Sequence, residues 1–203
     1  GAVVIEASES KTGMVASKIG CESDAKYAIQ ITNVGSGYSR LTDDFLYNAW
    51  NFEGQEVFKR AVKAMAQASE DVLKQADMTL SDIKLVVPHQ ANKRILDALA
   101  RRIGINEDKV FVNVHKYGNT SAGTIPVALC EAVEEHRIEP GDYILMASFG
   151  AGLTYGASLI KWGDRVTPLQ SSDAELPPCD KTGLEIIASH VERYRKRTLE
   201  TAS

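Results

Sequence analysis

Three short segments of the sequence place hydrogen-bond donors and small residues at predicted turns. Residues 87–92 (VPHQAN) carry His89 directly after an apolar run, residues 116–122 (KYGNTSA) carry Asn119, and residues 149–152 (FGAG) follow another apolar run. The imidazole of His89 and the side-chain amide of Asn119 can both donate a hydrogen bond to a substrate oxygen. The small residues of the third segment would let a ligand approach the backbone closely.

Each segment also has a structural explanation that needs no ligand. A histidine at a strand-to-helix turn commonly bonds only the local backbone, because histidine is intermediate in burial and finds ordinary partners. Asparagine is a favoured N-cap, so Asn119 could do no more than begin the helix that follows it. The small residues at 150–152 could form only a tight hairpin. Taken one at a time, the segments do not decide between these alternatives.

The pattern of apolar residues predicts the elements that hold these segments. Apolar residues recur at helical spacing after Gly54, which predicts a first helix there. A second helix ends at Gly104, because glycine favours the left-handed conformation at a helix C-terminus. A third begins near Ser121. Strands are predicted at 2–6, 26–32, 83–87, 110–114, 143–149 and 154–162, with an irregular connection over 33–52.

Strands and helices alternate along the chain, and this order is expected of a layered α/β domain. Ligands in such sheets bind just beyond the ends of the strands. His89, Asn119 and residues 150–152 each follow a predicted strand, so all of them fall where a site would be built.

Composition and charge narrow the functional classes. The chain has 203 residues, 44% of them hydrophobic and 25% charged, which is ordinary for a globular protein. Its net charge of −4 argues against nucleic-acid binding, which needs a basic excess to neutralise phosphates. No apolar run approaches the roughly 20 residues of a membrane span, and no signal peptide is visible. The three cysteines lack metal-ligand spacing and fit a reducing compartment, so we expect a cytoplasmic protein without a metal site.

The composition changes after residue 163, which divides the chain into a body at 1–163 and a tail at 164–203. The tail begins as a polar linker that contains prolines. It continues as an amphipathic stretch in which apolar residues recur at heptad-like spacing from Leu184 to Tyr194, beside basic residues at 193–197. The tail could dock on the body, contact a partner or remain partly without fixed structure, and its sequence does not choose between these.

The three segments and their order resemble β-ketoacyl-acyl-carrier-protein synthase III of the thiolase superfamily. The resemblance rests on HQAN at 89–92, GNTSA at 118–122, FGAG at 149–152 and GQEVFK at 54–59, and it extends from Gly1 to Trp162. It implies a thiolase-like layered α/β/α fold of two similar halves, of which this chain is the C-terminal half. Its first strands would then complete the sheet of the N-terminal half.

The family's nucleophile is a cysteine in the N-terminal half. None of Cys21, Cys130 and Cys179 lies in a segment that resembles the nucleophile site. The resemblance therefore implies that the N-terminal half is a partner of this chain, and that the chain is inactive alone.

The resemblance also assigns a role to each candidate residue. In the family, the cysteine takes an acyl group from a CoA thioester, and malonyl-acyl carrier protein then loses carbon dioxide to form an enolate that attacks the acyl-enzyme. His89 and Asn119 would donate to the thioester oxygen on which negative charge develops. Phe149 would line the site. The N–H of Ala151, where the family usually has glycine, would complete a second oxyanion hole. No cofactor is implied beyond the two substrates.

Four basic residues match positions that face the CoA phosphates and the acidic carrier protein in the family: Lys59, Arg94, Arg101 and Arg102. The alternative is an ordinary solvated face of charged residues. A homodimer is expected as well. Two other functions stay open. One is acyl transfer to an alcohol or amine without condensation, and the other is a non-catalytic subunit that pairs with another thiolase-fold chain.

Overall fold

The computed structural model describes residues 1–5, 7, 9–25, 27–31, 50–167, 178–188, 191, 192 and 195. The chain forms two compact units, Gly1–Thr167 and Pro168–Ser203. Within the second unit, residues 183–188 are helical, and the side chains of Leu184, Ile186 and Ile187 are exposed. None of the helices in these described ranges is long and apolar enough to cross a membrane.

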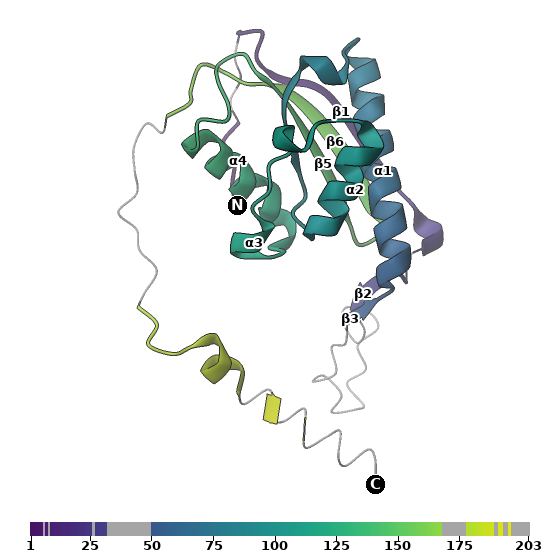
Figure 1. Ribbon diagram of the computed structural model, residues 1–203, viewed down its shortest axis with the longest axis vertical. Coiled ribbons are helices and arrows are strands. Elements are labelled where there is room, and N and C mark those ends of the chain that lie inside the picture. Colours follow the sequence, from purple (N-terminus) through teal and green to yellow (C-terminus); the bar gives the residue numbers. More distant parts are fainter. Residues whose placement is uncertain are drawn as a thin grey trace. The chain divides into compact units, whose positions relative to one another are not determined.

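A four-stranded sheet in the order β1–β6–β5–β4 forms the centre of the first unit (Figure 1). β4 and β5 run parallel, whereas β6 is antiparallel to both β5 and β1. The carboxyl ends of β4 and β5 therefore meet at one edge of the sheet. The bounds of its strands are Gly13–Cys21 for β1, Ile83–Pro88 for β4, Tyr143–Gly150 for β5 and Thr154–Lys161 for β6. Two short strands, β2 (Ile29–Ile31) and β3 (Trp50–Phe52), pair antiparallel in a separate sheet.

Helices cover both faces of the main sheet (Figure 1). α1 (Gly54–Gln75) and α2 (Lys93–Ile103) pack together on one face, and α4 (Thr124–Glu134) packs against β4 on the other. A short helix, α3, spans Val114–Tyr117. Single 3-10 turns lie at Ser23–Ala25, Leu80–Asp82, Glu107–Lys109 and Ser121–Gly123.

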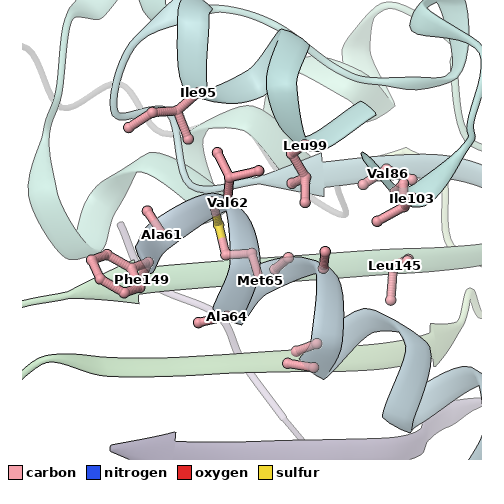
Figure 2. Close-up of a cluster of buried hydrophobic side chains, with 14 of the residues drawn as sticks. Ala61, Val62, Ala64, Met65, Val86, Ile95, Leu99, Ile103, Leu145 and Phe149 are labelled. Carbon is pink, nitrogen blue, oxygen red and sulfur yellow. The ribbon is translucent and has the colours of Figure 1, made fainter. Parts of the chain in front are cut away.

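The larger core lies between α1, α2 and the sheet (Figure 2). Small residues on α1 let the helix lie close to the strands, and larger aliphatic side chains of α2 fill the space beside it. Because Phe149 at the end of β5 is part of this core, packing holds that strand end in place. The labelled members are Ala61, Val62, Ala64 and Met65 of α1, Ile95, Leu99 and Ile103 of α2, and Val86, Leu145 and Phe149 of the strands.

The three predicted helices are confirmed, as are the buried strand at 83–87 and the strand pair formed by β5 and β6. α2 ends at Gly104, which has the left-handed conformation (φ 78°) that stops a helix. Of the predicted irregular connection at 33–52, only residues 50–52 lie within the described part of the chain, and these form β3.

Near the N-terminus, the observed strands differ from the predicted ones in three ways. Residues 1–5 form no strand, and the side chains of Val4 and Ile5 are 95% and 86% exposed, because no neighbouring strand pairs with them in the described structure. Of the strand predicted at 26–32, the structure describes residues 27–31, and the strand within them is Ile29–Ile31. β1 was not predicted, because only Ala16 of its nine residues is buried and its sequence shows no clear alternation.

The strand predicted at 110–114 is replaced by a single bridge between Val86 and Val110. Phe111 N–H still donates to the carbonyl of Val86 at 2.9 Å. The backbone N–H groups of Asn113 and Val114 instead donate to the side-chain oxygen of Gln90, at 2.9 and 3.2 Å. The side chain of Gln90 thus takes the place of a strand partner, and the chain turns into α3.

Candidate active site

A cavity of about 670 Å³ in the first unit is lined by the four residues that the sequence assigns to catalysis and to the pocket: His89, Asn119, Phe149 and Ala151. His89 follows β4 directly, and Phe149 lies at the end of β5. Asn119 lies in the loop between α3 and α4, and Ala151 lies in the turn between β5 and β6. The parallel pairing of β4 with β5 explains why residues 60 positions apart reach one cavity.

The side chain of His89 is fixed on one side and faces the cavity with the other. Its backbone N–H donates to the carbonyl of Ala147 at 2.8 Å, which ties the residue to β5. Nδ1 lies 2.6 Å from the hydroxyl oxygen of Thr124, at the start of α4. Burial lowers the pKa of His89 below its ordinary value of 6.5, so the ring is neutral near pH 7. A neutral ring carries one N–H and remains able to donate one hydrogen bond.

The side-chain amide of Asn119 is oriented by its own loop. Its Oδ1 accepts a hydrogen bond from the backbone N–H of Ser121 at 2.9 Å. Within the described part of the chain, the Nδ2 group makes no hydrogen bond and remains available as a donor. Asn119 is not the N-cap of α4, because that helix begins at Thr124 after Gly123.

Another asparagine, Asn92, is an N-cap, but of a different helix. Oδ1 of Asn92, the last residue of the HQAN segment, accepts a hydrogen bond from Ile95 N–H at 3.0 Å and so caps α2. Within the HQAN segment, Asn92 thus has an ordinary structural function, whereas His89 faces the cavity.

The turn at 151–153 is held from two sides. The hydroxyl of Thr154 donates to the carbonyl of Ala151 at 3.0 Å. Leu153 and Glu22 exchange backbone hydrogen bonds of 3.3 and 2.8 Å, and the carboxylate of Glu22 accepts from Arg60 at 2.7 Å. The backbone N–H of Ala151 has no hydrogen-bond partner among the described residues. The segment is both a tight hairpin and a cavity wall with a free backbone donor.

Gln90 anchors the loop that carries Asn119. Gln90 is 1% exposed, and its Nε2 donates to the carbonyls of Pro88 and Phe111 at 2.9 and 3.0 Å. Its Oε1 accepts from Asn113 and Val114. The Asn113 side chain in turn donates to Glu131 of α4 at 2.8 Å. This buried network attaches the start of the loop to the strand end that carries His89.

Glu131 also accepts hydrogen bonds from other side chains near the start of the same loop. The hydroxyl of Tyr117 donates to Glu131 Oε1 at 2.6 Å, and Lys116 Nζ lies 3.2 Å from the same oxygen. The hydrogen bond from Tyr117 is the largest cause that lowers the pKa of Glu131, so this carboxylate is ionised at neutral pH. The loop is therefore fastened to α4 as well as to Gln90.

The four predicted basic residues are divided between two places. Lys59 and Arg94 line a second hollow of about 540 Å³, which shares Phe52, Val57, Asn92 and Ile95 with the walls of the first cavity. The guanidinium of Arg94 lies 5.8 Å from the centre of the Phe58 ring. Arg101 and Arg102 are exposed in the last turn of α2 and line neither hollow.

Sequence reasoning missed several residues of the site. Thr124 and Gln90 make the contacts that fix His89 and the Asn119 loop, and Ile19 and Tyr155 of β1 and β6 add to the cavity wall. The sequence shows that Thr124 has a hydroxyl and Gln90 an amide. It does not show that their hydrogen-bond partners lie 21 to 35 residues away.

Neither a cluster of metal-ligating side chains nor a cysteine is found at the cavity among the described residues. These residues contain no group of three or more His, Cys, Asp or Glu side chains that could hold a metal ion. Cys21, Cys130 and Cys179 are free and exposed, and none lines the cavity.

The amino-acid sequence of the chain is similar to those of known proteins. A family model described as 3-oxoacyl-[acyl-carrier-protein (ACP)] synthase III C terminal matches residues 73–162. Proteins named beta-ketoacyl-[acyl-carrier-protein] synthase III 2 from Vibrio cholerae and Vibrio vulnificus are 45% and 49% identical to the chain over 200 and 197 residues. The matches cover 98% and 97% of this chain but 55% and 54% of the relatives, so the chain spans about half the length of the curated relatives it matches.

Solved structures agree with the sequence matches. The crystal structure of 3-oxoacyl-[acyl-carrier-protein] synthase III from Aquifex aeolicus is similar at a TM-score of 0.69 and 38% identity, covering 77% of this chain and 46% of that chain. The enzyme of the same name from Pseudomonas aeruginosa is similar at a TM-score of 0.71 and 29% identity, covering 80% and 48%. The predicted thiolase-like α/β fold class is confirmed. The chain belongs to the β-ketoacyl-acyl-carrier-protein synthase III family, and its residues correspond to the C-terminal half of those enzymes.

Proposed function

We propose that this chain supplies the decarboxylation and condensation machinery of an enzyme that joins an acyl group from CoA to malonyl-acyl carrier protein, at the start of fatty-acid or related polyketide synthesis. One observation carries the proposal. The cavity that His89 and Asn119 both line is reached by two donor groups, His89 Nε2 and Asn119 Nδ2, that make no hydrogen bond within the described part of the chain.

The two donors act on the malonyl thioester. When its terminal carboxylate leaves as carbon dioxide, the electron pair of the broken C–C bond moves into the adjacent thioester and places negative charge on its oxygen. Hydrogen bonds from His89 and Asn119 stabilise that enolate. One such donor contributes about 3 to 4 kcal/mol of transition-state stabilisation, because it is oriented before the charge develops.

The enolate carbon then attacks the carbonyl carbon of an acyl group held as a cysteine thioester, and the thiolate leaves. The oxygen of this second carbonyl becomes negative during the attack. The free backbone N–H of Ala151 would donate a hydrogen bond to this oxygen as part of a second oxyanion hole. The two oxygens are thus stabilised by different groups.

The cysteine that carries the acyl group belongs, in this proposal, to an N-terminal half outside this chain. Cys21, Cys130 and Cys179 do not line the cavity. Burial and the nearby carboxylate of Glu134 raise the pKa of the Cys130 thiol, which is the opposite of what a nucleophile needs. The chain alone is therefore inactive.

The exposed apolar residues of the first unit support docking of that half. Val3, Val4, Ile5, Met14, Val15 and Ile19 lie in residues 1–5 and on β1, and all are exposed. Soluble monomers rarely leave such a group uncovered. We infer that residues 1–5 pair with a strand of the N-terminal half, and that the complete enzyme is a homodimer.

Basic side chains support binding of the carrier and of CoA. Lys59, Arg94, Arg101 and Arg102 form no ion pair with any carboxylate of the described residues, whereas Arg60, Lys93 and Lys116 all do. Unpaired cations beside the second hollow suit a phosphate or an acidic protein surface. Of the four, Lys59 and Arg94 line this hollow, so we expect them to contribute most.

Acyl transfer to an alcohol or amine without condensation is the second candidate function. The neutral ring of His89 also suits the general base of that reaction. Asn119 distinguishes the two candidates, because a second donor to a developing enolate has no use in simple acyl transfer.

An assay of the complete enzyme, with this chain and the N-terminal half, tests the proposal. Acyl transfer from acyl-CoA to cysteine and decarboxylation of malonyl-acyl carrier protein are measured separately for His89→Ala and Asn119→Ala. We expect decarboxylation to fall by about 100-fold or more while acyl transfer stays near the parent rate. Parallel loss of both steps, together with a lower melting temperature, would mean that the two residues only support the fold.

A further inference from the structure

The hydroxyl of Thr124 is buried against the ring of His89. Thr124 is 3% exposed at the first residue of α4, and its Oγ1 lies 2.6 Å from His89 Nδ1. Within the described residues this hydroxyl makes no other hydrogen bond. The contact is short enough to be a full hydrogen bond, and it joins two elements that are 35 residues apart.

Two arrangements of hydrogen fit this contact, and their costs differ. If Nδ1 carried the ring hydrogen, it would donate to Thr124, and the hydroxyl hydrogen of Thr124 would be buried without an acceptor. An unsatisfied buried donor costs about 1 to 3 kcal/mol. If Thr124 donates to Nδ1, its hydroxyl hydrogen is satisfied and the ring hydrogen lies on Nε2. That N–H faces a cavity in which water or a substrate oxygen can accept it.

We propose that Thr124 is a positioning residue that donates its hydroxyl hydrogen to Nδ1 of His89, and so holds the ring as the tautomer that carries its hydrogen on Nε2. The donor that His89 presents to the cavity then depends on the first turn of α4. A neutral histidine in the other tautomer would present a lone pair to a developing negative charge and would repel it.

The same helix start and loop connect both donors. Thr124 lies five residues after Asn119, and the backbone N–H of Ser121, between them, orients the Asn119 amide. One short segment, 119–124, therefore sets the direction of both hydrogen-bond donors. The tautomer is a property of this chain alone, while its use in decarboxylation rests on the function proposed above.

Nuclear magnetic resonance of the chain labelled with ¹⁵N-histidine tests the inference directly. A long-range ¹H–¹⁵N correlation spectrum separates protonated from unprotonated ring nitrogens in each of the four histidines. The His89 signals are those that a His89→Gln variant lacks. At a pH where the ring is neutral, we expect Nδ1 to resonate as an unprotonated nitrogen and Nε2 as a protonated one.

Variants of Thr124 show whether the hydroxyl is the cause. Thr124→Val keeps the shape of the side chain and removes its donor, so the Nδ1 resonance should shift. Thr124→Ser keeps the hydroxyl and should retain the parent spectrum. Thr167→Val, at an exposed position of the first unit that lines neither hollow, is the matched control and should leave the His89 signals unchanged.

Two results would overturn the inference. One is a protonated Nδ1 in the parent chain, and the other is a Thr124→Val spectrum in which neither ring nitrogen of His89 moves. Failure of the proposed function would look different. The spectra would then be as expected, while the complete enzyme with Thr124→Val decarboxylated malonyl-acyl carrier protein at the parent rate.

Discussion

Gln90 and Asn113 are joined by a buried hydrogen bond of 2.9 Å, in which the backbone N–H of Asn113 donates to the side-chain oxygen of Gln90. This contact ends the regular pairing beside β4 and starts the turn that leads to Asn119. It lets a glutamine next to the candidate catalytic histidine determine where the loop with the second donor begins.

Replacing Gln90 should therefore destabilise the chain. Gln90→Met has a similar volume but leaves two carbonyls and the N–H of Asn113, all buried, and the partly buried N–H of Val114 without their partner. We expect the free energy of unfolding to fall by about 2 to 4 kcal/mol in urea titrations. Gln67→Met, at an exposed position on α1, is the control and should change stability by no more than about 0.5 kcal/mol. Equal effects of the two substitutions would contradict the assigned role.

Two glycines in the β5–β6 turn should respond differently to alanine. Gly152 has a φ of 138°, and an added Cβ would lie 2.7 Å from Cγ2 of Thr154. Gly150 has room, since its added Cβ would meet only Thr154 Oγ1, at 3.9 Å. We expect Gly152→Ala to destabilise by about 1 to 3 kcal/mol and Gly150→Ala by less than about 1 kcal/mol, measured by chemical unfolding. A larger loss for Gly150→Ala would show that the turn is built differently.

The titration of His89 should make stability depend on pH. Burial lowers its pKa in the folded chain below 6.5, so the unfolded chain takes up a proton at a higher pH than the folded chain does. The stabilisation that depends on neutral His89 is complete above about pH 6.5 and is lost as the pH falls toward the folded-state pKa. Melting temperatures between about pH 7 and pH 5 should fall more steeply for the parent chain than for His89→Gln. A His89 titration midpoint at or above 6.5 in nuclear magnetic resonance would refute this.

Replacement of both donors should be less than additive in the complete enzyme. His89 and Asn119 would stabilise one developing charge. Once either is removed, the remaining donor therefore contributes less transition-state stabilisation. We expect the loss of decarboxylation in His89→Ala/Asn119→Ala to be smaller than the product of the two single losses. Fully multiplicative losses would indicate that the two residues act at separate steps.

The chain alone should not become acylated. Its three cysteines are exposed and none lines the cavity, and the pKa of the Cys130 thiol is raised by its surroundings. After incubation with acetyl-CoA, the intact mass should remain that of the unmodified 22.1 kDa chain. A stoichiometric acetyl adduct on Cys21, Cys130 or Cys179 would overturn the assignment of the nucleophile to another part of the enzyme.

The sequence by itself determined the local elements and the set of candidate residues. α1 and α2 were predictable because their apolar residues repeat at helical spacing and Gly104 marks the end of α2. The β5–β6 pair was predictable because two apolar runs flank a short turn. The HQAN, GNTSA and FGAG segments were recognisable because each combines distinctive residue types within a few positions.

The tertiary structure alone decided the contacts between distant segments. β1 joins the sheet by pairing with β6 more than 130 residues later, and a mostly exposed edge strand carries no alternating signal of its own. Residues 110–114 have the composition of a strand, yet the side chain of Gln90 satisfies their backbone and redirects the chain. Thr124 faces His89 only because α4 packs against β4. Local preference acts over a few residues, whereas hydrogen-bond partners across the fold are set by which elements pack together.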